Sequence, residues 1–172
     1  VDGVSYQFVT IADVTSSIVG NIVTFKDTDV YEGTYVTTKY TVDTSNASQR
    51  FLLADNRADT TTLTVKVQNS STDITASTYK RATDITQLTT SSEVYYLQEV
   101  ESGKFQVYFG DGINGKALAD GNIVILEYIV TNKDVSNSAS SFSLSGNIGG
   151  FSDVTITTIS NSQGGAEAET DE

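Results

Sequence analysis

The sequence predicts an all-β protein. Threonine, serine and β-branched residues are abundant, apolar and polar residues alternate, and long runs of helix-forming residues are scarce. The chain has 172 residues, which is enough to bury a hydrophobic core. We expect at most one or two short helices, and antiparallel sheets in a sandwich-like arrangement that forms two β-units.

Several segments alternate between apolar and polar residues, as a half-buried strand does. The clearest are residues 62–67 and 104–109. Residues 123–126 are apolar on both faces, which predicts a central strand that is covered on both sides. Further strands are expected at residues 6–8, 21–25, 35–42, 50–53, 94–100, 142–144 and 154–159.

Glycine marks two of the turns between these segments. Ser102-Gly103 separates two expected strands at the spacing of a hairpin, and glycine provides the positive φ that such a turn needs. Asp120-Gly121 precedes the expected central strand in the same way. These positions therefore predict where the chain reverses direction.

One short helix is expected at residues 85–90. Asp84 precedes this segment and suits the N-cap position, because a carboxylate accepts hydrogen bonds from the free amides of a first turn. Leu88 is expected to pack inward. The β-branched residues in the segment favour a short element.

The composition argues against several classes of function. The chain has neither cysteine nor histidine, which removes disulfides, thiolate nucleophiles, Cys-ligated zinc and the usual general base. The net charge of −12 opposes binding to nucleic acid and to anionic membranes, both of which attract basic residues. No apolar run reaches the about 18 residues of a membrane span. Because the chain begins at Val1 without a signal peptide, we expect a fragment of a longer protein.

The segment GDGING, residues 110–115, has the composition of a ligand-binding loop but the wrong spacing. A phosphate-binding loop needs Lys followed by Ser or Thr and then a helix, whereas Lys116 is followed by alanine and a strand. A calcium loop needs oxygen ligands at alternate positions, whereas Ile113 and Gly115 occupy the alternate positions after Asp111. We therefore expect no cofactor or metal here. Instead, a broad hairpin is expected, shaped by three glycines in conformations closed to other residues: Gly110, Gly112 and Gly115.

Two carboxylate pairs are the other candidates for chemistry. Glu99 with Glu101, and Asp111 with Asp120, have the residue types of a glycosidase acid/base pair. Nothing in the sequence places either pair at a working separation, and the chain has no Trp to stack on a sugar ring. Solvated surface is therefore the better interpretation of both pairs.

The tyrosines allow two interpretations. Tyr95-Tyr96 lies in an expected strand, which predicts one core residue and one surface residue. Tyr31, Tyr35 and Tyr40 could line an interface, where Tyr is enriched, or pack on a sheet. Without His or Cys no common nucleophile–base pair can be assembled. We therefore expect no enzyme, and we assign no catalytic, cofactor-binding or metal-binding residues.

Two longer stretches carry a recognisable pattern. Residues 85–128 read ITQLTTSSEVYYLQEVESGKFQVYFGDGINGKALADGNIVILEY, and residues 159–172 read ISNSQGGAEAETDE. Both resemble baseplate wedge proteins of contractile-tailed bacteriophages, within the baseplate-J-like family, and the opening DGVSYQFVTIADV is similar to the strand that begins that family's β-domain. The chain departs from many relatives at Ala117-Leu118, where they carry Pro-Pro, and at residues 132–134, where they carry a Gly-rich turn.

The resemblance implies a structural role and transfers no catalytic residue. It implies a component of the tail baseplate in the virion, produced in the cytoplasm of the host bacterium. The implied partners are other baseplate proteins and copies of the chain itself, as a homodimer or ring in the intact protein. The implied function is assembly, with rearrangement when the tail contracts.

The resemblance also implies a division of the chain. In simpler relatives the segments similar to DGVSYQFV and ISNSQGG follow one another closely, whereas a long insertion separates them here. We expect residues 1–30 and 137–172 to form one discontinuous baseplate-J-like β-unit. Residues 31–136 then form an inserted β-domain with the FGDGINGK hairpin, because insertion at a surface loop costs little closure entropy.

A rival hypothesis from another class remains open at this point. An extracellular β-sandwich adhesin, or a carbohydrate- or calcium-binding module, would also be rich in Thr and Ser, acidic and free of cysteine. Stabilisation by calcium would favour this alternative.

Overall fold

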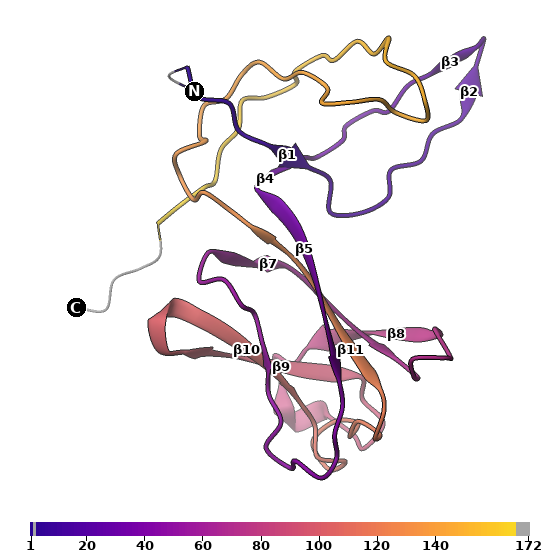
Figure 1. Ribbon diagram of the computed structural model, residues 1–172, viewed down its shortest axis with the longest axis vertical. Coiled ribbons are helices and arrows are strands. Elements are labelled where there is room, and N and C mark those ends of the chain that lie inside the picture. The colour runs from indigo at the N-terminus through magenta and orange to yellow at the C-terminus, as the bar shows by residue number, and fades with distance from the viewer. Residues whose placement is uncertain (2, 168–172) are drawn as a thin grey trace. The chain divides into compact units, whose positions relative to one another are not determined.

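The computed structural model describes residue 1 and residues 3–167 (Figure 1). The described residues form strands, turns and two short 3-10 helices, so the predicted all-β class is confirmed. The chain forms two compact units, which are Val1–Gly33 with Asn132–Glu172, and Thr34–Thr131. The proposed insertion of residues 31–136 into a unit of residues 1–30 and 137–172 stays a prediction.

The unit Thr34–Thr131 is built on one seven-stranded sheet. Its strand order is β5-β11-β7-β8-β9-β10-β6. All neighbours pair antiparallel except β8 and β9, which run parallel, so the sheet is mixed where the sequence predicted antiparallel strands. The strands are β5 (Thr34–Thr41), β6 (Phe51–Leu52), β7 (Ala58–Gln68), β8 (Ala76–Arg81), β9 (Val94–Val100), β10 (Lys104–Phe109) and β11 (Ile123–Val130).

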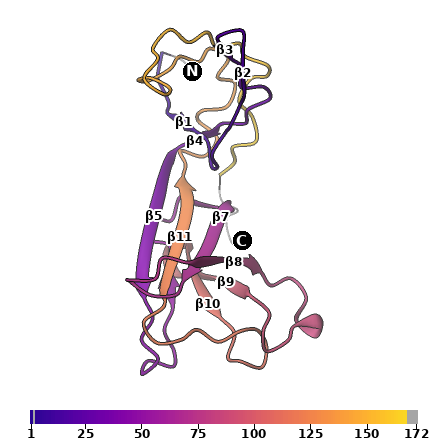
Figure 2. The ribbon, with the colours of Figure 1, turned by 90° about the vertical axis from the view of Figure 1, so that its right-hand side faces the viewer.

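The sheet curls until its two edge strands meet. Figure 2 shows β5, β11 and β7 side by side, with β8, β9 and β10 crossing their direction. At the seam, the phenolic hydroxyl of Tyr40 on β5 donates to the carbonyl of Leu52 on β6 at 2.5 Å, and the Tyr40 ring lies 5.7 Å from that of Phe51. The sheet is therefore nearly closed, and its inner face surrounds the core.

Strand β11 supplies the centre of that core. Val124, Leu126 and Tyr128 are 0–1% exposed and face Val65 of β7 and Val107 of β10 within one apolar cluster. Full burial of a side chain of this size stabilises the fold by about 1.5–3 kcal/mol. The predicted central strand is confirmed, because β11 lies between β5 and β7.

The opposite face of β11 is covered as well, which explains its apolar sequence. Ile125 is 8% and Ile129 is 0% exposed. Pairing with β7 shifts register between Glu127 and Ile129. Thr62 bridges this irregularity, because its hydroxyl accepts from the amide of Ile129 at 3.0 Å and donates to the carbonyl of Asp59 at 2.8 Å. The buried hydroxyl thus replaces part of the interrupted ladder.

The local predictions for the turn and the helix hold in part. The 3-10 helix η1 (Ile85–Gln87) begins after Asp84, whose carboxylate accepts from the amide of Thr86 at 2.9 Å. It is shorter than the predicted helix because Leu88 already has an extended backbone. Strands β9 and β10 form the predicted hairpin through η2 (Glu101–Gly103), in which Ser102 and Gly103 both have positive φ.

The unit Val1–Gly33 with Asn132–Glu172 contains only short strands among its described residues. Strand β1 (Phe8–Val9) pairs with β4 (Tyr31–Glu32), and β2 (Ile18–Val19) pairs with β3 (Ile22–Val23). The predicted strands at residues 142–144 and 154–159 are wrong. Their apolar alternation is present, but no described backbone pairs with either segment, and a strand needs such a partner.

Candidate functional site

The GDGING segment is the first candidate, and its place in the sheet differs from the prediction. It begins residues 110–122, which connect β10 to β11. These two strands are not neighbours, because β10 pairs with β9 and β6 while β11 pairs with β5 and β7. The predicted hairpin is therefore wrong, and the segment is a crossover connection within the sheet.

The carboxylate of Asp111 is used inside this connection. Its Oδ1 accepts from the amides of Asn114 and Ile113 at 3.0 Å and 2.9 Å, and these bonds hold the pKa of Asp111 below its usual value. The amide of Gly112 donates to the carbonyl of Gly115 at 3.0 Å. These hydrogen bonds order the loop from within.

Gly112 and Gly115 have the predicted conformations, whereas Gly110 is required for close packing instead. A Cβ on Gly110 would lie 2.5 Å from the carbonyl oxygens of Asn114 and Gly115. Gly112 and Gly115 have φ of +85° and +99°, which L side chains rarely adopt. Close packing and positive φ account for this glycine pattern.

Residues 89–93, which precede β9, hold the connection in place. The amide of Gly115 donates to the carbonyl of Thr89 at 3.2 Å, and the amide of Lys116 donates to that of Ser92 at 2.8 Å. The ammonium group of Lys116 lies 2.7 Å from the carboxylate of Glu93, and this bond lowers the pKa of Glu93 and raises that of Lys116. The pair ties the loop to the residue before β9.

Several aspartates of the unit Thr34–Thr131 accept hydrogen bonds from nearby backbone amides, as Asp111 does. In an Asx turn, an aspartate accepts from the backbone amide two residues later, which builds a loop without other secondary structure. Hydrogen bonds of this kind contribute to lowered pKa values at five positions, which we call the Asx aspartates: Asp43, Asp55, Asp73, Asp84 and Asp111.

The two candidate carboxylate pairs have different surroundings. Asp120 accepts from the amide of Thr44 at 3.0 Å, whereas Asp111 binds amides of its own loop. Glu99 and Glu101 are both exposed, one in β9 and the other in η2. Among the described residues, His, Cys, Asp and Glu side chains form no group of three that could hold a metal ion.

The tyrosines do not form one cluster. Tyr95 is 5% exposed and faces the core, whereas Tyr96 faces outward, as the alternation predicts. Tyr96 stacks on Tyr108 with ring centroids 5.0 Å apart, and the guanidinium of Arg50 lies 4.8 Å from the Tyr108 ring. Tyr96 also donates to the carbonyl of Asn114 at 3.0 Å. The stack therefore supports the GDGING connection.

Tyr31, Tyr35 and Tyr40 have separate environments. Tyr35 and Tyr40 lie on opposite faces of β5, because their positions differ by an odd number of residues. Tyr40 packs inward at the seam, while Tyr35 is 40% exposed. Tyr31 belongs to β4 in the other unit and is 37% exposed. An interface role is therefore open to the two exposed tyrosines.

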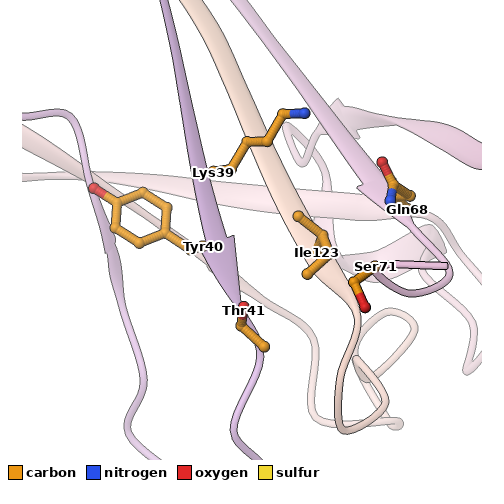
Figure 3. Close-up of a pocket in the computed structure, with 6 residues that line it drawn as sticks. All are labelled: Lys39, Tyr40, Thr41, Gln68, Ser71 and Ile123. Atoms are coloured by element: carbon orange, nitrogen blue, oxygen red, sulfur yellow. The ribbon is translucent and has the colours of Figure 1, made fainter. Parts of the chain in front are cut away.

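Two small pockets of the unit Thr34–Thr131 are wide open to solvent. One of about 270 Å³ lies on the outer face of the sheet, where Lys39, Ile123 and Gln68 extend from three adjacent strands (Figure 3). Another of about 370 Å³ is lined by Arg50, Phe51 and residues of the GDGING connection. Small-molecule sites enclose most of the surface of their ligand. Neither pocket is closed enough to do so.

The β2–β3 hairpin exposes four large apolar side chains. Ile18, Val19, Ile22 and Val23 are 72%, 76%, 66% and 45% exposed. Ile18 is paired with Val23, and Val19 with Ile22, so the two pairs lie on opposite faces of the hairpin. Both faces are therefore apolar and uncovered. Sequence reasoning expected one strand at residues 21–25 and missed the turn at Gly20-Asn21, although the pattern IVGNIV marks it.

Comparison with known proteins places the chain in one family. Within the part of the chain that the structure describes, no helix is both long and apolar enough to cross a bilayer. No curated protein matches the chain. Residues 35–142 match the family described as bacteriophage baseplate wedge protein gp6, third domain. This match covers more than half of the chain and nearly all of the unit Thr34–Thr131. The chain with this nearly closed β-sheet is therefore a member of the family of bacteriophage baseplate wedge protein gp6, third domain.

Proposed function

We propose that the chain holds neighbouring baseplate proteins together through protein–protein contacts, and that these contacts rearrange when the tail contracts. Membership of the family makes the chain a component of the baseplate wedge, which belongs to the virion tail and assembles with other baseplate proteins. In the proposal, the intact protein forms a homodimer or ring, is produced in the host cytoplasm and has no catalytic role.

The observation that carries this proposal is the exposed apolar surface of the unit Val1–Gly33 with Asn132–Glu172. Among its described residues, Ala139 is the one apolar side chain that is buried. Soluble monomers rarely leave large apolar patches uncovered, and a β-unit is stabilised by burying one face of its strands. The exposed residues are Val4, Ile11, Val14, Ile18, Val19, Ile22, Val23, Phe25, Val30, Tyr31, Val135, Ile148, Phe151, Ile156 and Ile159.

The β2–β3 hairpin is the part of this surface best suited to a partner. A two-stranded hairpin is marginally stable by itself, and both faces of this one are apolar. Residues 14–25 contain no charged side chain, although the whole chain carries a net charge of −12. A charge-free segment lowers the electrostatic cost of contact with another acidic protein. We propose that a partner covers this hairpin in the assembled wedge.

The proposed domain organisation agrees with this role. An inserted β-domain at residues 31–136 would leave residues 1–30 and 137–172 as the part that makes the assembly contacts. The apolar cluster of the unit Thr34–Thr131 supports independent folding of the inserted part.

Cryo-electron microscopy of the parent virion before and after contraction tests the proposal. We expect Ile18, Val19, Ile22 and Val23 to be buried against another protein chain, and their neighbours to differ between the two states. Exposure of these side chains to solvent in both states would overturn the proposal.

A variant of the intact protein provides a second test. Ile18→Ser combined with Val23→Ser makes one face of the hairpin polar, and we expect loss of co-assembly with the other wedge proteins in co-expression and size-exclusion chromatography. Ile74→Ser is the matched control, because Ile74 is 79% exposed but belongs to the other unit. Equal co-assembly of both variants would contradict the role of the hairpin.

A further inference from the structure

Charge is unevenly distributed between the two units. Val1–Gly33 with Asn132–Glu172 contains eleven acidic and two basic residues, whereas Thr34–Thr131 contains eleven acidic and eight basic residues. Many acidic side chains of Thr34–Thr131 are in loops, where the Asx aspartates bind backbone amides. The strands of this unit therefore present a surface that is much less acidic than the chain as a whole.

The outer face of β5, β11, β7 and β8 carries three lysines. The register places Lys39 on β5 and Lys66 on β7 on either side of Ile125, which is 8% exposed. Thr78 on β8 pairs with Lys66, and Lys80 lies two residues further along the same face. We call the face defined by Lys39, Lys66 and Lys80 the basic wall.

Two of these lysines form no ion pair with a described residue. The ammonium group of Lys66 lies 2.8 Å from the carboxylate of Glu127 on the neighbouring strand. Within the described residues, neither Lys39 nor Lys80 forms an ion pair, and both are exposed. Figure 3 shows Lys39 extending over the shallow pocket beside Ile123 and Gln68. The wall therefore offers two unneutralised positive charges.

We propose that the basic wall binds the acidic segment of residues 166–172, AEAETDE, from a second copy of the chain. Charge complementarity selects this occupant, because the segment contains four carboxylates and no basic residue. Glu167 is ion-paired with Lys133 of its own copy, so Glu169, Asp171 and Glu172 are the carboxylates proposed to meet the wall. An extended segment of five residues spans about 16 Å. The three strand spacings from β5 to β8 span about 14 Å and the two-residue offset of Lys80 adds about 7 Å along the strand, so the diagonal between the two lysine positions is about 16 Å. The segment is therefore long enough to reach both unneutralised lysines.

This contact rests on the proposed function, since it names one partner of the wedge component. It joins two different surfaces, the wall of one copy and the acidic segment of the next. A contact of this kind between unlike surfaces builds a ring when the rotation closes, and an open chain when it does not. It would act in addition to the apolar contacts of the β2–β3 hairpin.

Binding of a labelled peptide to the intact chain tests the inference. The probe is a fluorescein-labelled peptide of residues 163–172, QGGAEAETDE, and the readout is fluorescence anisotropy at low salt. We expect saturable binding that weakens strongly as salt rises, because exposed charges are screened. Lys39→Glu with Lys80→Glu should weaken binding at least tenfold, because two attractions become two repulsions. Lys39→Gln with Lys80→Gln should weaken it less, and circular dichroism checks that both variants are folded.

Two controls separate charge from other causes. Lys26→Glu makes the same charge change as Lys39→Glu but lies in the other unit, and it should leave peptide binding unchanged. A peptide with Gln and Asn in place of the acidic residues should not bind. Equal binding of this neutral peptide, or unchanged binding to the Lys39→Glu with Lys80→Glu variant, would overturn the inference.

The outcome is separable from that of the proposed function. Ile18→Ser with Val23→Ser should bind the peptide as the native chain does, although we expect it to lose co-assembly. Absence of peptide binding together with loss of co-assembly in that variant would overturn the role of the basic wall alone. Peptide binding together with intact co-assembly of that variant would contradict the proposed role of the hairpin and keep the wall.

Discussion

Gly110→Ala probes how the GDGING connection is held. A Cβ at this position would lie 2.5 Å from the carbonyl oxygens of Asn114 and Gly115. The backbone must therefore move, and both carbonyls accept hydrogen bonds, from the hydroxyl of Tyr96 and from the amide of Gly112. Loss of two hydrogen bonds costs about 1–3 kcal/mol, and overpacking costs a similar amount. We expect the free energy of unfolding to fall by about 2–4 kcal/mol.

Urea denaturation followed by tyrosine fluorescence and circular dichroism measures this change. Gly121→Ala is the control, because Gly121 has a φ of +76° but no atom would lie within 4 Å of a Cβ added there. Its cost is the left-handed backbone alone, about 1–2 kcal/mol. Should Gly110→Ala destabilise the chain no more than Gly121→Ala, close packing of the connection would be refuted as the reason for this glycine.

Three further predictions concern the same unit. Leu126→Ala should lower the free energy of unfolding by about 2–5 kcal/mol in urea denaturation, since Leu126 is fully buried, whereas Leu52→Ala, at an exposed position, should cost less than about 1.5 kcal/mol. Thr62→Val should cost about 1–3 kcal/mol, because it leaves the buried amide of Ile129 without its acceptor, and Thr37→Val on the surface serves as the control. The Asx aspartates have lowered pKa values, so their stabilisation is complete above the ordinary carboxyl pKa of about 3.9 and is lost as pH falls through their lower folded values. Unfolding free energies that stay constant from about pH 6 down to about pH 2.5 would contradict this last prediction.

The sequence predicted local structure where residues a few positions apart determine it. Alternation predicted one core and one surface residue at Tyr95-Tyr96, and Asp84 was expected to cap the helix; the structure shows Tyr95 buried and Asp84 at the N-cap of η1. Gly103 provides the positive φ of the β9–β10 turn. These features depend on side-chain direction and on hydrogen bonds within a few residues, and both follow from the chain itself.

The sequence predicted one feature of the candidate site and missed another. The spacing around Asp111 and Lys116 already argued against phosphate and calcium loops, and the structure shows both side chains occupied by protein groups. The exposed β2–β3 hairpin was not found, because apolar residues on both faces also describe a buried strand. Only the exposure of Ile18 and Val19 in the folded chain distinguishes the two cases.

By itself, the sequence determined the all-β class, the Ser102-Gly103 turn and the alternation of residues 62–67 and 104–109. Tertiary structure alone decided which strands become neighbours. It separated β10 from β11, made β8 and β9 parallel, and left the apolar residues 154–159 without a strand partner among the described residues. The physical reason is that alternation specifies side-chain direction, whereas pairing is a long-range choice among many similar backbones. That choice depends on which arrangement closes the sheet around β11 and buries Val124, Leu126 and Tyr128 together.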